Sequence, residues 1–266
     1  MSDRVERELR DTYSSAAASW DAGPSRVYHL LADALVARVP SVLAGARVLD
    51  LGAGTGVVSS TLAPTGARVI AADVAYGMLQ LGAVTRPPAV CADAARLPFR
   101  SNSFDHVIAA FVLNHVPDLV GALIELARIV RPGGSIAASS FPTDRQHPAK
   151  ESIGKVIDAA GFVPPDWFAT FKAEREGPTG SEDALRRAAS AAGLAHTVVH
   201  DLDVDISGVG AEGLAAYRLG MAQVQPFLGS LEAAQRADAE RAAAAAAAPF
   251  LAIPMPMLTL VARVQG

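Results

Sequence analysis

A short apolar run that ends in an acid is followed by glycines at every second position. Residues 48–56 read Val-Leu-Asp-Leu-Gly-Ala-Gly-Thr-Gly, so Asp50 precedes Gly52, Gly54 and Gly56. Glycines in a strand-to-helix turn let a ligand lie against the backbone, beside the N–H groups of the helix N-terminus. The dinucleotide fingerprint is G-x-G-x-x-G, whereas the spacing here is G-x-G-x-G. A carboxylate before the turn would repel a pyrophosphate, so we expect a ligand with a cationic amine and an anion, as in an amino acid.

Two further acids occupy the expected ends of neighbouring strands. Asp73 follows the next apolar run, where an acid can accept hydrogen bonds from ribose hydroxyls. Asp93 and Ala94 follow a third run, where a carboxylate can accept from an adenine amino group. Ligands of open parallel sheets bind beyond the carboxyl ends of the strands. Three acids at successive strand ends therefore predict a ligand in which an amino acid is joined to adenosine.

The elements that must position these residues alternate between strand and helix. Apolar runs predict strands at 47–51, 67–72, 89–92, 104–111 and 135–141, and helical spacing predicts helices at 57–63, 75–83 and 118–130, the last closed by 131–134. This alternation without hairpin signals predicts a parallel sheet with helices on both faces.

The pattern loosens after position 141. The proline-rich stretch 142–180 predicts irregular structure or a lid. Beyond it we expect a helix at 181–192 capped by Ser181, a strand at 195–206, helices at 211–228 and 231–248, and a last strand at 257–264.

Residues 48–141, about a third of the chain, resemble the core of class I S-adenosylmethionine-dependent methyltransferases, in particular the small-molecule group related to quinone and polyketide methyltransferases. The matching elements are residues 48–56, Asp73 with Met78, Asp-Ala-Ala-Arg-Leu-Pro-Phe at 93–99, Ser-Phe-Asp at 103–105, Leu-Asn-His-Val at 113–116 and Leu-Ala-Arg-Ile-Val-Arg-Pro-Gly-Gly at 126–134.

The resemblance implies an α/β fold with a Rossmann-like, seven-stranded, mostly parallel sheet. Helices cover both faces, and the last strand, at 257–264, inserts antiparallel. We expect one methyltransferase domain over 1–266. Within it, 1–40 would be a helical lid, 41–141 the cofactor-binding core, and 142–180 and 207–250 insertions that build the acceptor pocket.

The resemblance also implies which residues hold S-adenosyl-L-methionine. Asp50 with Gly52, Gly54 and Gly56 would hold the methionine moiety, Asp73 the ribose, and Asp93 and Ala94 the adenine, with Met78 and Ala110 as further contacts. In the family, a helix with a Tyr-Asp…Ala…Tyr-Asp pattern covers the cofactor. Tyr13 matches its first aromatic, whereas Trp20-Asp21 replaces the second Tyr-Asp. A solvated amphipathic helix packed on the core is an equal alternative.

The catalytic residues are less clearly marked. Methyl transfer is an in-line displacement in which positioning and desolvation supply much of the acceleration, and a base is needed only when the nucleophile must lose a proton. His115, just past the fourth strand, is the first candidate base, although a structural role is an equal alternative. His147 and Tyr28 are weaker candidates in expected lid segments. No metal-ligand spacing is present, so we expect no metal.

Composition excludes several partner classes. A net charge of −4 and a pI near 5.9 give no basic surface for nucleic acid. The single cysteine, Cys91, fits a reducing cytosol, and the charged first ten residues do not form a signal peptide. The uncharged stretch 242–262 contains three prolines and predicts a helix end, a turn and a buried strand rather than a membrane span. We therefore expect a cytoplasmic protein, with a homodimer left open.

The expected activity is methyl transfer to a small, apolar or aromatic acceptor, which fits secondary metabolism. Aromatic and apolar residues available to line its pocket are Phe111, Phe141, Trp167, Phe168, Tyr217, Met221 and Phe227. The main alternative keeps the fold and cofactor but catalyses cyclisation, decarboxylation or hydroxylation. A nicotinamide dehydrogenase is disfavoured by the glycine spacing and by Asp50.

Overall fold

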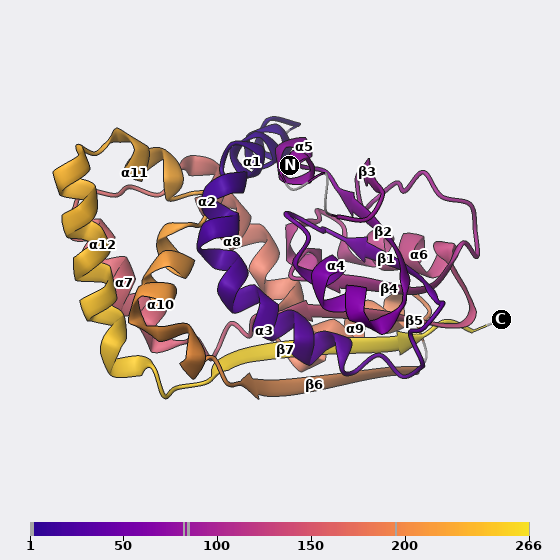
Figure 1. The fold of residues 1–266 in the computed structure, drawn as a ribbon. Helices are drawn as coiled ribbons and strands as arrows, with labels where there is room; N and C mark the ends of the chain where they lie inside the picture. Colours follow the sequence, from indigo (N-terminus) through magenta and orange to yellow (C-terminus); the bar gives the residue numbers. More distant parts are fainter. Residues whose placement is uncertain (1–2, 82, 84–85, 195, 266) are drawn as a thin grey trace.

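The chain folds around one seven-stranded sheet, shown in Figure 1 for a computed structural model that describes residues 3–81, 83, 86–194 and 196–265. Its strand order is β3-β2-β1-β4-β5-β7-β6, and only β7 runs antiparallel to its neighbours. The strands are β1 (Arg47–Leu51), β2 (Arg68–Asp73), β3 (Ala89–Cys91), β4 (Phe104–Ala110), β5 (Val130–Ser140), β6 (His196–Val204) and β7 (Met255–Arg263). The expected Rossmann-like topology, including the antiparallel last strand, is confirmed.

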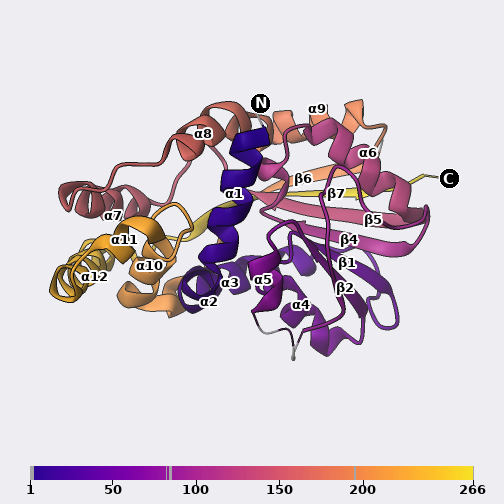
Figure 2. The same cartoon turned by 90° about the horizontal axis from the view of Figure 1, so that it is seen from above.

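Helices cover both faces of the sheet, as the view in Figure 2 shows. One face carries α3 (Pro24–Val36), α4 (Val57–Leu62) and α5 (Tyr76–Gln80). The other face carries α6 (Leu119–Ile129) and α9 (Glu182–Ala191). The sequence of α6 explains its place: Asp118 caps it by accepting from the Gly121 N–H, and its apolar positions at helical spacing are all buried.

A lobe of four helices lies beyond one end of the sheet, at the left of Figure 1. It consists of α7 (Pro148–Ala159), α10 (Gly210–Leu219), α11 (Gln225–Ser230) and α12 (Ala233–Ala247). These helices share an apolar core with the start of β7 and with one face of α3. Because this core packs against α3, the lobe is attached to the molecule at the carboxyl ends of the parallel strands.

The segment 142–180 corrects the sequence interpretation, because it holds two helices, α7 and α8 (Asp166–Thr179). Two of the prolines that argued against helices stand at helix starts, where helices tolerate them, and a third lies inside the last turn of a helix. Pro148 is the first residue of α7, Pro165 precedes α8, and Pro178 lies in the last turn of α8. A proline in the first turn loses no internal hydrogen bond, since its missing N–H would have no partner in the helix.

Three boundaries also differ from expectation. The predicted helix at 211–228 is divided into α10 and α11, and residues 131–134 are strand, because β5 begins directly after α6. Gly133, at φ +80°, donates from its N–H to the Val264 carbonyl, which extends the pairing of β5 with the end of β7. The helix expected at 75–83 ends at Gln80; position 82 and Ala195, where a strand was expected to start, lie outside the described residues.

The N-terminal helices cross the sheet at the carboxyl ends of its strands. These are α1 (Asp3–Ser15) and α2 (Ala17–Ala22), which lead into α3. The helix α1 packs on α5 and α8, and its apolar face meets Trp167 and Phe171 of α8. The helices α1 and α2 therefore lie over the strand ends, and we call them the cover.

Among the helices that the structure describes, none is long and apolar enough to cross a membrane.

Candidate functional site

The main cavity, of about 810 Å³, opens at the carboxyl ends of β1, β2 and β4 beneath α1, α2 and α3. Its lining brings together ten residues singled out from the sequence, which are Tyr13, Trp20, Tyr28, Gly52, Gly54, Asp73, Met78, Ala110, Phe111 and His115. This is the edge of a parallel sheet at which ligands bind. The floor is polar backbone and the cover is aromatic, so one end of a ligand meets hydrogen-bond donors and the other meets rings.

The glycine turn after β1 forms the floor of this cavity. Gly52, Gly54 and Gly56 have φ values of +67°, +54° and +104°, a region that residues with a Cβ rarely adopt. At Gly52 a Cβ would also lie 2.4 Å from the Cβ of Val112. Gly52 and Gly54 line the cavity, while Gly56 caps α4 and lines a separate surface groove beside Arg86.

Asp73 joins the glycine turn to the start of α5. One carboxylate oxygen accepts from the Gly54 N–H at 2.8 Å, and the other accepts from the Ala75 N–H at 2.8 Å. Burial raises the pKa of this carboxyl, and the backbone N–H donors together with the charge of Arg86 oppose that rise. These two hydrogen bonds hold the Asp73 carboxylate in place at the cavity wall. Its remaining lone pairs can accept from a hydroxyl.

Asp50 lies beneath the turn and does not line the cavity. Its Oδ2 accepts from the Ser59 N–H at 2.9 Å and from the Ser59 hydroxyl at 2.6 Å, which ties β1 to the first turn of α4. Within the described residues, its Oδ1 is buried without a hydrogen-bond partner. Burial is the main cause that raises the pKa of Asp50 to about 7, and the Ser59 hydrogen bonds partly oppose it.

The cover of the cavity is aromatic. The Trp20 ring stacks on Tyr28 with centroids 5.2 Å apart, and Tyr13 meets the edge of His115 at 5.5 Å. Burial, followed by the charge of Asp73, raises the pKa of Tyr13 well above its ordinary value, so its hydroxyl stays protonated at neutral pH. Such a cover removes water from the floor below it.

His115 lies at the side of the cavity, in a short turn after β4. Its ring is held between Tyr13 and Phe171 of α8, on which it stacks with centroids 4.7 Å apart. Trp167 and Phe168, expected in an acceptor pocket, instead pack with Phe171 against α1. These α8 rings do not line the main cavity, and they support His115 and the cover from behind.

A layer of four rings separates the main cavity from a second one of about 400 Å³. Tyr28 and Phe111 line the main cavity, whereas Phe141 and Tyr217 line the second. Phe111 and Phe141 have centroids 4.4 Å apart, and Tyr28 is within 6.3 Å of each other ring. Phe111 has φ +53°, strained for a residue with a Cβ, and such strain concentrates at functional sites.

Other residues singled out from the sequence lie away from the main cavity. His147 lines the second cavity; its Nδ1 accepts from the Ala149 N–H and its Nε2 donates to the Ile253 carbonyl, so both ring nitrogens are engaged. Burial lowers its pKa. Met221 and Phe227 belong to the core of the helical lobe. The described residues hold no cluster of ligands suited to a metal ion.

Asp93 and Ala94 follow β3, which pairs with β2, so they lie one strand further along the edge than Asp73. Asp93 is exposed and accepts from the Ala95 N–H at 2.8 Å, while Ala94 is buried in the core. Neither lines the main cavity in this arrangement.

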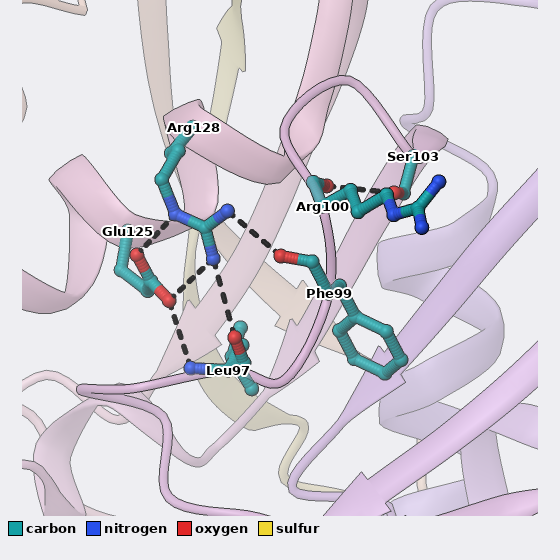
Figure 3. A network of polar contacts seen from close by, with 6 residues as sticks. All are labelled: Leu97, Phe99, Arg100, Ser103, Glu125 and Arg128. Carbon is teal, nitrogen blue, oxygen red and sulfur yellow. Dashed lines mark hydrogen bonds and ion pairs between the residues drawn. The ribbon is translucent and has the colours of Figure 1, made fainter.

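An ion pair within α6, between Glu125 and Arg128, holds the loop that follows Asp93 through hydrogen bonds to its backbone, as Figure 3 shows. Arg128 donates to Glu125 at 2.7 Å and to the carbonyls of Leu97 and Phe99, and Glu125 accepts from the Leu97 N–H at 2.8 Å. The pKa of Glu125 is lowered, chiefly by its hydrogen bonds from Arg128. The network fixes the loop that carries the sequence motif 93–99, by contacts that the motif did not reveal.

The central segment is similar to known proteins. Residues 49–138 match a family model described as a methyltransferase domain. The demethylmenaquinone methyltransferase of Corynebacterium urealyticum is 44% identical over 99 residues, which are 37% of this chain and 43% of that protein. The one of Mycobacterium sp. strain KMS is 48% identical over 103 residues, 38% of this chain and 45% of that protein. The match thus spans less than half the length of these relatives.

Solved structures resemble more of the chain, at lower identity. Phosphoethanolamine N-methyltransferase 2 of Haemonchus contortus, in complex with S-adenosyl-L-methionine, has a TM-score of 0.58 and 17% identity, over 89% of this chain and 52% of that one. The cyclase SpnF has a TM-score of 0.56 and 19% identity, over 90% of this chain and 81% of that one. At these identities the likeness is one of fold.

Proposed function

We propose, from the premise that residues 49–138 form a class I S-adenosylmethionine-dependent methyltransferase domain, that the chain methylates a small, apolar or aromatic acceptor such as a quinone. The observation that carries the proposal is the main cavity, in which the glycine turn and Asp73 face a cover of aromatic rings. The names of the quinone-methylating relatives support an aromatic acceptor, and secondary metabolism is a fitting context for it.

Residues at successive strand ends would hold different parts of the cofactor. When bound, the cofactor supplies a methyl group on a positively charged sulfur. The backbone of Gly52 and Gly54 would receive the amino-acid end, and Asp50 would hold the turn from below and favour a cationic amine. Asp73 would accept from the ribose hydroxyls. Met78 and Ala110 would make apolar contacts, while Asp93 and Ala94 remain adenine-side candidates because their strand lies next to that of Asp73.

The cover serves the reaction by excluding water and orienting the acceptor. Tyr13 and Trp20 close the cavity above the turn, and an in-line displacement at a sulfonium gains from such a dry, ordered site. His115 is the candidate base for an acceptor that must lose a proton, since it lines the cavity beside Tyr13. Tyr28 is an orienting candidate, because burial raises its pKa and keeps the hydroxyl protonated.

Cofactor binding and methyl transfer are tested separately. S-adenosylhomocysteine should raise the melting temperature, whereas NAD and NADP should not, because ligands stabilise the state that binds them. Methyl-labelled cofactor should then transfer its label to a member of a panel of naphthoquinols and phenols. Stabilisation by a nicotinamide alone would overturn the proposal. Conversion of an acceptor without incorporation of label would instead support the cyclase-type alternative, a reaction named for one protein of this fold.

The role of His115 is tested with His115→Gln. We expect kcat to fall by about 100-fold or more for an acceptor that must lose a proton, since general bases contribute at least that much. The loss should lessen at high pH, where the acceptor ionises by itself. Affinity for S-adenosylhomocysteine should stay unchanged. A pH-independent loss, accompanied by weaker cofactor binding, would show that His115 only supports the cover through Phe171.

A further inference from the structure

The second cavity has a one-sided charge. It is lined by Phe141 after β5, by the start of α7, by α10 and by the first residues of β7. Four of its lining residues are basic or histidine, namely Arg145, His147, Lys150 and Arg218, and none of the described lining residues is acidic. The remaining lining is mostly apolar. An anion bound here would therefore lose water and would need the basic groups as its partners.

The basic groups differ in what already holds them. Arg145 is paired with Asp201 and with Asp203, the latter at 2.9 Å. His147 uses both ring nitrogens within the protein, as described above. Arg218 is different: its guanidinium lies 5.8 Å from the centroid of the Tyr217 ring, and its Nε is buried without a hydrogen-bond partner among the described residues. A buried guanidinium donor without an acceptor is costly unless a ligand supplies one.

The second cavity shares a wall with the main one. Tyr217 and Phe141 of its lining touch Tyr28, which lines the main cavity. The Tyr28 and Tyr217 centroids are 5.9 Å apart, and the Arg218 guanidinium lies over the Tyr217 ring. Two aromatic side chains, Tyr217 and Tyr28, therefore separate a charge bound at Arg218 from the main cavity.

We propose that the second cavity is a recognition subsite for an acidic group of the acceptor, with Arg218 as the residue that selects it. The acceptor class is an aromatic or apolar molecule that carries a carboxylate or an ionised hydroxyl. Its acid bonds the Arg218 guanidinium and its rings lie on Phe141 and Tyr217. The rings of the shared wall separate this subsite from the main cavity, so methyl transfer requires them to move aside. The inference rests on the proposed function for the reaction but not for the binding.

The probes are 1-hydroxy-2-naphthoate and its neutral counterpart 1-naphthol, titrated by calorimetry into the full chain saturated with S-adenosylhomocysteine. The acid should bind at least tenfold more tightly than the naphthol, since charge-assisted hydrogen bonds are the strong ones. In Arg218→Gln the acid should lose about tenfold or more in affinity, while the naphthol is unchanged. Arg218→Lys, which keeps the charge but loses the planar donors, should lie between.

The control is Arg241→Gln, which removes an exposed arginine of the same lobe and should change neither affinity. Stabilisation of every variant by S-adenosylhomocysteine verifies folding. Equal binding of acid and naphthol to the natural chain, no binding of the acid at millimolar concentration, or unchanged acid binding in Arg218→Gln would each overturn the subsite. Absence of label transfer with acid binding intact would count against the methyltransferase proposal alone.

Discussion

The buried carboxyl of Asp50 makes the stability of the chain depend on pH. Its pKa is raised to about 7 in the fold, whereas an exposed aspartate titrates near 3.9. Between these values the folded state binds the proton and the unfolded state does not. Stability therefore falls as pH rises from about 4 to about 7, and levels off above that range. A cationic amine near the turn would favour the charged form and offset this loss.

Asp50→Asn removes the charge and keeps an oxygen that can accept from Ser59. We expect its melting temperature to fall less than that of the natural chain between pH 4.5 and 7.5. Part of the slope should persist, because the pKa of Asp73 is raised as well. Scanning fluorimetry across this range measures both proteins. An unchanged slope would mean that Asp50 is ionised throughout.

At the scale of elements, the approach of α1 to α5 depends on a glycine. The Gly77 N–H donates to the Ser14 hydroxyl at 3.3 Å, and a Cβ on Gly77 would lie 2.3 Å from the Ser14 carbonyl oxygen. Backbone cannot yield as a flexible side chain does, so a methyl group here must push the two helices apart. The same contact positions Tyr13, one residue before Ser14, over the cavity.

We therefore expect Gly77→Ala to weaken binding of S-adenosylhomocysteine by about tenfold or more, as measured by calorimetry. Its melting temperature without ligand should change little, because the two apolar cores of the sheet contain no residue of α1. Gly154→Ala is the matched control: Gly154 is interior to α7 with open space around its Cβ position, and alanine favours a helix. Equal effects of both changes would refute the close contact.

At the scale of the whole molecule, the chain divides into a sheet, a helical lobe and a cover that touches both. The cover has small apolar clusters of its own, one shared with α8 and one with α5, separate from the large cores. Segments with few buried contacts open locally at lower free energy than the core. The cover is thus the part whose opening can admit ligands while the sheet stays folded.

Hydrogen exchange measures this difference. On addition of S-adenosylhomocysteine, amides of α1 and α2 should exchange more slowly, because a ligand beneath the cover stabilises its closed state. Amides of β4 and β5 should change little, since they are already protected by the core, and α12, remote from the main cavity, serves as the control. Equal slowing across all helices would indicate global stabilisation instead of closure of the cover.

Most of the sheet and its covering helices could be predicted from local pattern. The strands around 48–56 and the helix from Leu119 follow from periods and caps that lie within a dozen residues. The prediction for 142–180 was wrong because its prolines were weighed as helix breakers, whereas Pro148 begins α7, Pro165 directly precedes α8 and Pro178 is accommodated in the last turn of α8. The cofactor motifs were visible since each lies next to the end of its own strand.

The sequence by itself determined the glycine turn, the acids at strand ends and the order of the layers, because each depends on neighbours along the chain. Only the tertiary structure decided that Asp50 lies beneath the turn instead of in the cavity. It alone brought Tyr28, Phe111, Phe141 and Tyr217 into one wall and left Arg218 behind it. These rings come from four separate segments, and a contact between distant segments is set by the packing of the whole core.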